Sequence, residues 1–381
     1  MSWQKITGQE RVKNILQRAI IENKVAHSYC FWGIDGCGKD ALAIEFAKAH
    51  NCLSPIVREN TISACDECEN CKSIDSLQNP NVQLLFSLPT PKNSSSKDEN
   101  ILYKMSEEQL EEIKQQIALK AKNHYHKISI SGANQIKIAS VREIKKNLSM
   151  SSITAGRRFI IISNADELTS EASNAFLKTL EEPNDDITII LTTSRIESIL
   201  PTILSRSQQI HCSPIPDELI QTHIIENFNK SIEEAKIISV FAQGSYQKAI
   251  EYLDEDMQAF RETAINAFRY CLVNNYRIKL LKTLDPIFKL KNKKKLEQFI
   301  TLLMLWLRDA VILNTTRNKN LIINIDQVEA LELFVNYFGK KDLPACIEKL
   351  ELAISRIPKN VMTELILMDL FLDLRNILLK K

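Results

Sequence analysis

The sequence GIDGCGKD, residues 33–40, decides the fold of the first half of the chain. Gly33, Gly38 and Lys39 have the spacing of a phosphate-binding loop, and Gly36 adds a third glycine. The whole chain has only 8 glycines, so this cluster marks a place where the backbone must curl tightly. In such loops, successive backbone N–H groups and a helix N-terminus bind phosphate oxygens, and the lysine adds a positive charge. The stretch predicts a strand–loop–helix unit of nucleotide-binding ancestry.

The flanking patterns predict an α/β fold with a parallel sheet. Residues 29–32 form a short apolar run before the loop, and a helical pattern begins at Ala41 after it. Two further runs, Arg158–Ile162 and Ile187–Leu191, are β-branched and nearly all apolar, as central strands of parallel sheets are. Further along, strand signals fade and helical patterns dominate. We therefore expect an α/β domain over residues 1–213, followed by helical parts.

The loop lacks the chemistry of ATP hydrolysis. Asp40 stands where a Ser or Thr hydroxyl normally ligates magnesium, and a carboxylate there repels a triphosphate. The acidic residues expected at the end of the strand Arg158–Ile162 are replaced by Ser163 and Asn164, which carry no charge for magnesium and cannot act as a base. The pair Asp166–Glu167 lies past the strand end and is interpreted as a loop or helix cap. We expect a damaged nucleotide site; the alternative is a glycine turn that only joins a strand to a helix.

Four cysteines have the spacing of a metal site. Cys52, Cys65, Cys68 and Cys71 form the pattern C-x12-C-x2-C-x2-C. Two-residue gaps let neighbouring thiolates converge on one tetrahedral ion, which predicts Zn2+ with four sulfur ligands and no open position, hence a structural ion. An iron–sulfur cluster is the alternative. The other five of the 9 cysteines are scattered and are expected to be buried thiols.

Composition limits the classes of function. The 381 residues are 44% hydrophobic and 25% charged, with a net charge of +2, so no global field draws the protein to nucleic acid or an anionic membrane. The odd cysteine count and an N-terminus without a signal pattern predict a reducing, cytoplasmic location. The apolar run of residues 365–379 is interrupted by charges, so no membrane span is expected.

Residues 88–136 are interpreted as an insertion into the α/β domain. Residues 89–100 are polar and aperiodic, which predicts an exposed loop. Ser106–Gln109 fits a capping box, and an apolar stripe then predicts a surface helix. The sequence of this insertion indicates no function.

The segment of residues 156–183, GRRFIIISNADELTSEASNAFLKTLEEP, resembles the centre of clamp-loader subunits of bacterial DNA polymerase III. The four-cysteine module and Thr202–Arg206 are similar to that family as well, and the likeness spans nearly the whole chain. It implies an AAA+ α/β domain with a zinc module at about 52–71, a small helical lid over residues 214–256, and an all-helical collar domain for oligomerisation over residues 257–381.

Within this family the departures point to a subunit without ATPase activity. Asp40, Ser163 and Asn164 replace the groups of the motor subunits, and Gln247 stands where those subunits have an arginine that senses the γ-phosphate. The same losses put ATP binding in doubt. Arg206, read alone, is a salt-bridge partner. The resemblance implies instead that it reaches the ATP site of a neighbouring motor subunit, although Ser207 replaces the family's cysteine.

The resemblance thus implies the delta prime role, a scaffold in the ring that loads the sliding clamp on primed DNA. Its implied partners are the motor subunits and the delta subunit, in a hetero-oligomer that contacts the clamp and DNA. Two alternatives stay open. An ATPase motor subunit would show nucleotide turnover by the isolated chain. A free-standing zinc protein that binds DNA is disfavoured by the near-neutral charge, and it would show a salt-dependent affinity for duplex DNA.

Overall fold

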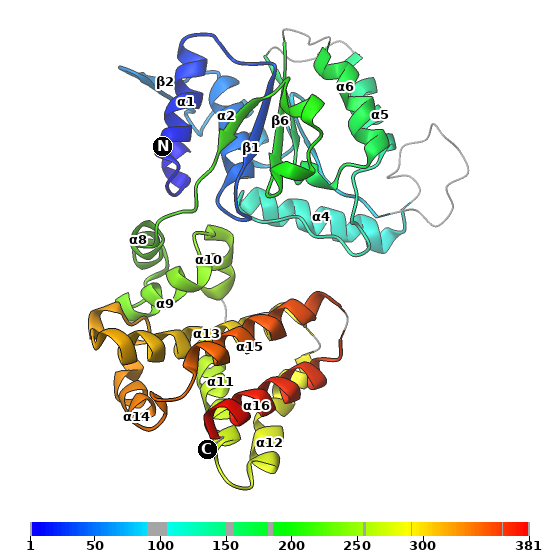
Figure 1. Cartoon of the computed structure of the whole chain (residues 1–381). Helices are drawn as coiled ribbons and strands as arrows, with labels where there is room; N and C mark the ends of the chain where they lie inside the picture. The colour runs from blue at the N-terminus through cyan, green and yellow to red at the C-terminus, as the bar shows by residue number, and fades with distance from the viewer. Residues whose placement is uncertain are drawn as a thin grey trace. The chain divides into compact units, whose positions relative to one another are not determined.

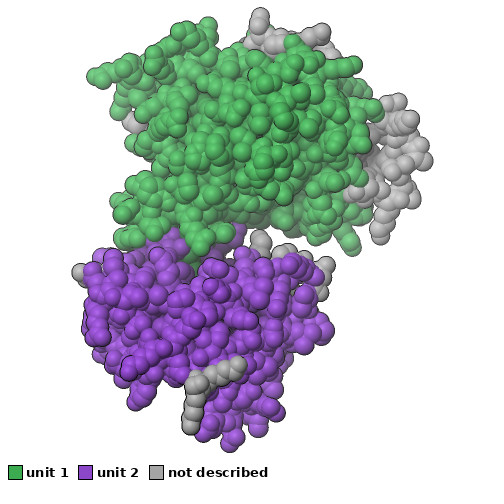
Figure 2. Space-filling view, viewed as in Figure 1, with its two compact units in different colours: residues 1–229, 241–250 green, residues 230–240, 251–381 purple. Residues whose placement is uncertain are grey.

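A computed structural model describes residues 2–89, 105–149, 156–181, 186–253, 257–290, 292–359 and 361–379. The chain divides into two compact units, which Figure 2 shows in different colours. Unit 1 consists of residues 1–229 and 241–250, and unit 2 of residues 230–240 and 251–381. Residues of the predicted lid, 214–256, are therefore shared between the two units, and the division into three domains stays a prediction.

Unit 1 is built on a parallel five-stranded sheet with the strand order β4-β5-β6-β1-β7. The strands of this sheet are β1 (Ser28–Trp32), β4 (Val82–Leu85), β5 (Arg158–Ile162), β6 (Ile187–Thr193) and β7 (Gln208–His211). A separate antiparallel hairpin pairs β2 (Ile56–Arg58) with β3 (Thr61–Ser63). The predicted strands at 29–32, 158–162 and 187–191 are confirmed. The short edge strands β4 and β7, of four residues each, were not predicted.

Helices cover both faces of the sheet, and Figure 1 shows α1 and α2 on one side of β1 and β6, with α5 and α6 on the other. The helices that begin in unit 1 are α1 (Glu10–Ile21), α2 (Lys39–His50), α3 (Glu69–Asp75), α4 (Glu107–Lys122), α5 (Ile138–Ser149), α6 (Ser170–Glu181), α7 (Pro201–Leu204), α8 (Asp217–Phe228) and α10 (Tyr246–Leu253). Alternate residues of β5 face opposite layers: Phe159 packs edge-on against Phe46 of α2, while Ile160 lies in a cluster with Phe176 of α6. This two-sided burial explains why the central strands are almost wholly apolar.

The strand register brings the loop and the end of β5 to one edge of the sheet. On β6, Leu191 pairs with Ile162 of β5 and with Cys30 of β1. Ser163 and Thr192 therefore lie at the same level, next to the end of β1, where the glycine-rich loop begins. In open parallel sheets, ligands bind in the crevice outside the carboxyl ends of the strands.

The part of the insertion from Met105 onward packs on its own small core. The predicted capping box is confirmed, because Ser106 Oγ accepts from the backbone N–H of Gln109 and the Gln109 side chain accepts from that of Ser106. Met105, Ile113 and Ile130 form the buried centre of the small core. Residues 90–100 of the predicted exposed loop lie outside the described residues.

Unit 2 is helical throughout its described residues. Its helices are α9 (Ile232–Ala242), most of which belongs to it, α11 (Met257–Leu272), α12 (Tyr276–Leu290), α13 (Lys293–Thr316), α14 (Val328–Phe338), α15 (Leu343–Arg356) and α16 (Thr363–Leu379). Phe268, Trp306 and Phe334 meet at its centre with ring centroids 5.1–5.9 Å apart. Across the parts of the chain that the structure describes, no helix has the length and apolar character needed to cross a bilayer.

Candidate functional site

The glycine-rich loop connects β1 to α2 in a conformation that requires glycine. Gly36 and Gly38 have φ values of 76° and 100°, which side chains rarely adopt. A Cβ on Gly36 would lie 2.1 Å from Ser245 Oγ, and one on Gly38 would lie 3.0 Å from the Tyr125 ring. The loop is therefore tightly covered from two directions, by the residues that begin α10 and by the insertion.

Lys39 bonds to the loop itself. Its Nζ donates to the carbonyl oxygens of Gly33 at 2.8 Å and Ile34 at 2.6 Å, and its side chain is buried. An ammonium has three donors, so two of the three that could meet a phosphate are used by the backbone of the loop.

Asp40, on the first turn of α2, is the centre of a charged cluster. Its carboxylate accepts hydrogen bonds from Lys120 Nζ at 2.7 Å, Ser163 Oγ at 2.7 Å and Thr192 Oγ1 at 2.6 Å. Burial raises the pKa of Asp40, but the Lys120 cation and the hydrogen bonds from Lys120, Thr192 and Ser163 outweigh it and lower the pKa to about 2. The carboxylate is therefore ionised at neutral pH and already neutralised from within the chain.

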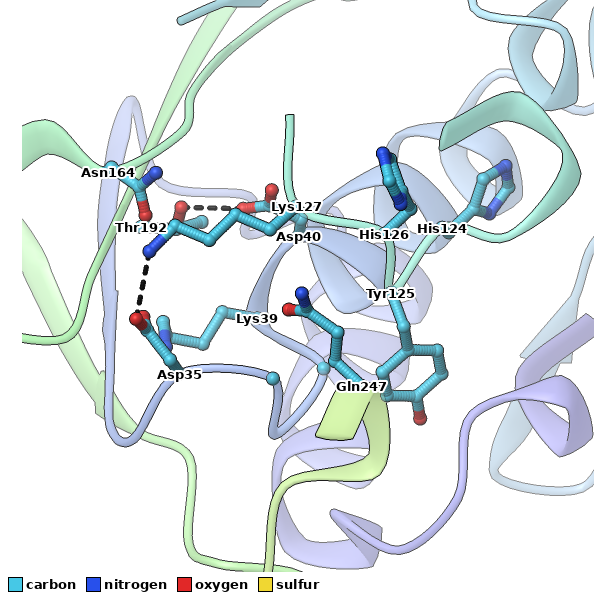
Figure 3. Close-up of a pocket in the computed structure, with 12 residues that line it drawn as sticks. Asp35, Lys39, Asp40, His124, Tyr125, His126, Lys127, Asn164, Thr192 and Gln247 are labelled. Carbon is cyan, nitrogen blue, oxygen red and sulfur yellow. Dashed lines mark hydrogen bonds and ion pairs between the residues drawn. The ribbon is translucent and has the colours of Figure 1, made fainter. Parts of the chain in front are cut away.

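The other predicted residues of the nucleotide site lie around a small cavity beside Lys39 and Asp40. Gly36, Gly38, Lys39, Asp40, Asn164 and Gln247 all line it. Figure 3 shows the side chains of Lys39, Asp40, Asn164 and Gln247 gathered there. Gly33 and Ser163 adjoin it through their bonds to Lys39 and Asp40. The structure thus brings together every residue predicted for the degenerate nucleotide site; their roles stay predictions.

Asp166 lies in the short 3-10 helix Ala165–Glu167 and has a structural role. Its carboxylate accepts from Thr193 Oγ1 at 2.8 Å and pairs with Arg195 at 2.7 Å. It joins the end of β6 to the turn after β5, so of the two interpretations, a loop residue or a helix cap, the structure fits a residue of the connection after β5.

The sequence reasoning missed Lys120, Tyr125 and Thr192, which complete the site. Lys120 is 1% exposed although it is a lysine on a surface helix. Lys120 comes three residues after Ile117, on the apolar stripe of the helix, and this position could have indicated its burial. The unusual Asp40 was a second signal, because a buried carboxylate needs a cation or hydrogen-bond donors.

The four predicted zinc ligands meet in one cluster. The Sγ atoms of Cys52, Cys65, Cys68 and Cys71 all lie within 4.8 Å of one another, and Cys65 and Cys71 Sγ are 3.9 Å apart. A tetrahedral ion with bonds of ~2.3 Å places its sulfurs about 3.8 Å apart, so the cluster fits such an ion. Burial raises the pKa of Cys68, but backbone N–H groups and neighbouring thiols lower it to about 6, which favours the thiolate that binds metals. The cluster can hold a metal ion.

A buried lysine attaches this cysteine module to α2. Lys48 Nζ lies 3.1 Å from Glu45, 2.8 Å from Asp66 and 2.9 Å from Asp75, and its side chain is 1% exposed. Asp66 stands between two cysteines of the cluster and Asp75 ends α3, so the fold of the module and the first helix after the loop depend on each other. The five remaining cysteines are buried, as predicted.

Arg206 lies just after α7 and apart from the cavity. Its Nη1 donates to the carbonyl oxygen of Thr202 at 3.0 Å, and its Nη2 is 3.2 Å from Glu181 Oε1. The Arg206 side chain is 38% exposed, so the guanidinium is accessible at the surface of unit 1. An exposed pair of this kind contributes little stability, on the order of 0–1 kcal/mol, and can exchange partners.

Comparisons with known proteins show which family this chain resembles. The sequence model of the family described as "DNA polymerase III, delta subunit" matches residues 8–216, just over half of the 381 residues. The delta' subunit of DNA polymerase III from Bacillus subtilis is 27% identical over 227 residues, which are 59% of this chain and 54% of that one. The tau/gamma subunit from Haemophilus influenzae is 25% identical over 289 residues, or 73% of this chain and 35% of that one.

This chain spans about half the length of the first relative and about a third of the second. A solved structure of a gamma subunit-related protein from Thermotoga maritima has a TM-score of 0.46 and 15% identity, over 96% of this chain and 99% of that one. Taking the family match with the parallel α/β unit, the helical unit and the four-cysteine cluster, the chain belongs to the DNA polymerase III delta-subunit family of AAA+ clamp-loader proteins.

Proposed function

We propose that this chain is a delta prime-type subunit of a DNA polymerase III clamp loader, which does not hydrolyse ATP and acts as a scaffold in the ring. Asp40 carries the proposal: a carboxylate, neutralised by Lys120, occupies the position where a hydrolysing subunit needs a free hydroxyl for magnesium. Ser163, at the end of β5, donates to the same carboxylate and supplies no acid for the metal. The likeness to the delta' subunit of Bacillus subtilis supports this role.

We propose that Arg206 of this chain contributes to catalysis at the ATP site of a neighbouring subunit. A guanidinium that reaches a transferring phosphoryl group stabilises its charge, and such arginine fingers increase rates by ~10³-fold or more. Arg206 is 38% exposed and, among the described residues, is held by the Thr202 carbonyl and Glu181, so it can be presented to a partner. The partners are the motor subunits and the delta subunit, in a cytoplasmic hetero-oligomer that loads the sliding clamp on primed DNA.

Steady-state ATP turnover with magnesium tests this function. We expect no turnover by the chain alone, and turnover in the mixture with motor subunits, clamp and primed DNA. Arg206→Ala should lower the rate of the mixture without loss of assembly, whereas Arg11→Ala, which removes an exposed arginine of α1, should not. An unchanged rate with Arg206→Ala, in a complex of normal composition, rules out the finger.

A motor subunit is the second candidate, because the tau/gamma relative matches 73% of this chain and the delta' relative only 59%. This candidate predicts ATP turnover by the chain alone that is lost with Lys39→Ala. A motor would also require magnesium to displace Lys120 from Asp40.

We further propose that the ion of the four-cysteine cluster is zinc with a structural role. Four thiolates fill a tetrahedral site and leave no position for substrate. Metal analysis of the purified protein should find about one zinc per chain. A protein folded without metal, or one that carries iron and inorganic sulfide, would contradict the assignment.

A further inference from the structure

The insertion, for which the sequence indicated no function, lies directly against the nucleotide loop. The residues in this contact are Lys120 of α4 and the four residues of the segment His124–Lys127 that follows it. Figure 3 shows the side chains of His124, Tyr125, His126 and Lys127, which belong to one stretch of chain beside the loop. Residues 88 positions apart in sequence, such as Gly38 and His126, thus line one cavity.

Lys120 supplies a positive charge where a nucleotide site uses a metal ion. Its Nζ is 2.7 Å from Asp40, and it also donates to the carbonyl oxygens of His126 at 2.8 Å and His124 at 3.4 Å. All three donors of the ammonium are therefore used, and all its partners are inside the chain. An ion that replaced it would have to displace a buried, fully bonded lysine.

Tyr125 covers the loop at the position that phosphates need. Its ring lies against Gly38, the N-cap residue just before α2, and its hydroxyl accepts from the backbone N–H of Thr7 at 2.9 Å. The Tyr125 ring also packs on Tyr246 of α10, with ring centroids 4.4 Å apart. Phosphates bind at a helix N-terminus, so an aromatic ring on Gly38 blocks their approach to α2.

One ion pair and one hydrogen bond fix the ends of the segment His124–Lys127. Lys127 Nζ lies 2.9 Å from Asp35 of the loop, and His124 Nε2 lies 3.2 Å from the carbonyl oxygen of Asp75 on the cysteine module. The segment is therefore bonded both to the loop it covers and to the module beside it.

The space that remains is too small for a nucleotide. The cavity between the loop and these side chains has a volume of about 40 Å3. Pockets for drug-sized ligands have ~300–1,000 Å3, and a single water needs ~10–15 Å3 of such volume. The cavity has room for a few waters but not for a nucleoside triphosphate.

We propose that α4 together with the segment His124–Lys127 is a built-in occupant of the nucleotide loop. This occupant excludes nucleotides, because Lys120 takes the place of the metal ion and Tyr125 takes the place of the phosphates. This goes beyond the absence of hydrolysis, since it denies the chain nucleotide binding altogether. It does not depend on Arg206 or on the scaffold role, so each can fail without the other.

The same contacts connect the loop to the start of α10. The backbone N–H of Gln247 donates to the Gly36 carbonyl at 3.3 Å, and Tyr246 touches both Tyr125 and His223 of α8. In a nucleotide-responsive subunit these residues would rearrange around the ligand. Here Tyr246 packs on Tyr125 and Gln247 is bonded to the loop, so we expect their arrangement not to change with the ATP concentration.

Nucleotide binding by full-length variants tests the proposal, with a fluorescent ATP analogue and magnesium as the probe. The wild-type protein should bind none at millimolar concentration. Asp40→Thr, which restores the magnesium hydroxyl but keeps the segment in place, should bind none as well. Asp40→Thr with Lys120→Ala and Tyr125→Ala should gain binding, and adding Lys39→Ala should abolish the gain. Asp40→Thr with Lys122→Ala, which changes an exposed lysine of the same helix, is the matched control and should not bind.

Hydrogen exchange of the wild-type protein provides a second measurement that needs no variant. The amides of residues 120–127 should exchange slowly and at the same rate with and without millimolar ATP. Faster exchange of this segment on ATP addition overturns the proposal. So does Lys39-dependent binding by the wild-type protein or by Asp40→Thr alone. Absence of binding by the triple variant, with normal protection of β1, β5 and β6, overturns it equally.

Discussion

Replacing Lys120 with methionine removes a charge from the centre of unit 1. The Lys120 side chain is 1% exposed and Asp40 is 21% exposed, with 2.7 Å between ammonium and carboxylate. At that distance two unit charges attract by about 6 kcal/mol with an effective dielectric constant of 20. The cost of burying the ammonium offsets part of this attraction, and breaking a buried pair by removing one partner costs ~3–5 kcal/mol. We expect Lys120→Met to lower the free energy of unfolding of unit 1 by that amount at neutral pH.

The stability deficit of Lys120→Met should depend on pH, because the protonation of Asp40 changes. The folded-state pKa of Asp40 is about 2, below its ordinary 3.8, so its ionised form stabilises the fold above about pH 4, and this stabilisation is lost as the pH falls through about 2. A difference of that size corresponds to about 2 kcal/mol. Without Lys120, the Asp40 carboxyl loses the largest of the causes that lower its pKa, so its ionised form stabilises the variant less than the wild type. The deficit of Lys120→Met should therefore shrink as the pH falls below about 4.

Urea unfolding at a series of pH values measures the deficit, and hydrogen exchange of α2 and β5 assigns the transition to unit 1. Lys122→Met is the control, because Lys122 is exposed on the same helix and should change stability by less than about 0.5 kcal/mol. The double variant Lys120→Met with Asp40→Asn should recover much of the loss, since it removes both charges. A deficit like that of the control, or one equal at acid and neutral pH, refutes the reasoning.

Three further predictions concern other contacts. Cys71→Ser, or removal of the metal by a chelator, should speed hydrogen exchange of α3 and of residues 123–127. The reason is that Asp75 of α3 bonds to both Lys48 and His124. Unchanged exchange at 123–127 would show that the cysteine module does not support the segment His124–Lys127. Lys48→Met should destabilise unit 1 by ~3 kcal/mol at neutral pH in urea unfolding, because it removes the buried ammonium that pairs with Glu45, Asp66 and Asp75. A loss no larger than that of the control Lys72→Met would contradict this. Asp309→Ala should destabilise unit 2 by ~2–4 kcal/mol, because Asp309 is fully buried and accepts hydrogen bonds from the backbone N–H groups of Ile323 and Asn324. Calorimetry that shows no shift in the unfolding transition of unit 2 would exclude this stabilising role of Asp309.

The sequence by itself determined the elements whose signals are local. The strands at 158–162 and 187–191 are buried on both faces, so their apolar runs identify them. The capping box at Ser106 requires residues three apart, and the cysteine spacing brings thiols together within one short segment. The glycines at 33, 36 and 38 and the unusual Asp40 likewise pointed to the loop, because backbone conformation and ligand charge are set by the residues themselves.

Only the tertiary structure decided what occupies the loop. Lys120 lies 80 residues from Asp40, and Thr192 lies 152 residues from it. Contacts at such separations follow from strand register and from the packing of α4, and no local pattern records them. A lysine on a helix is ordinarily exposed, so its burial becomes visible only when its partner is placed beside it. The sequence could predict that the nucleotide site had lost its chemistry, whereas only the fold places Lys120 beside Asp40, because charge neutralisation inside a protein depends on distance in space.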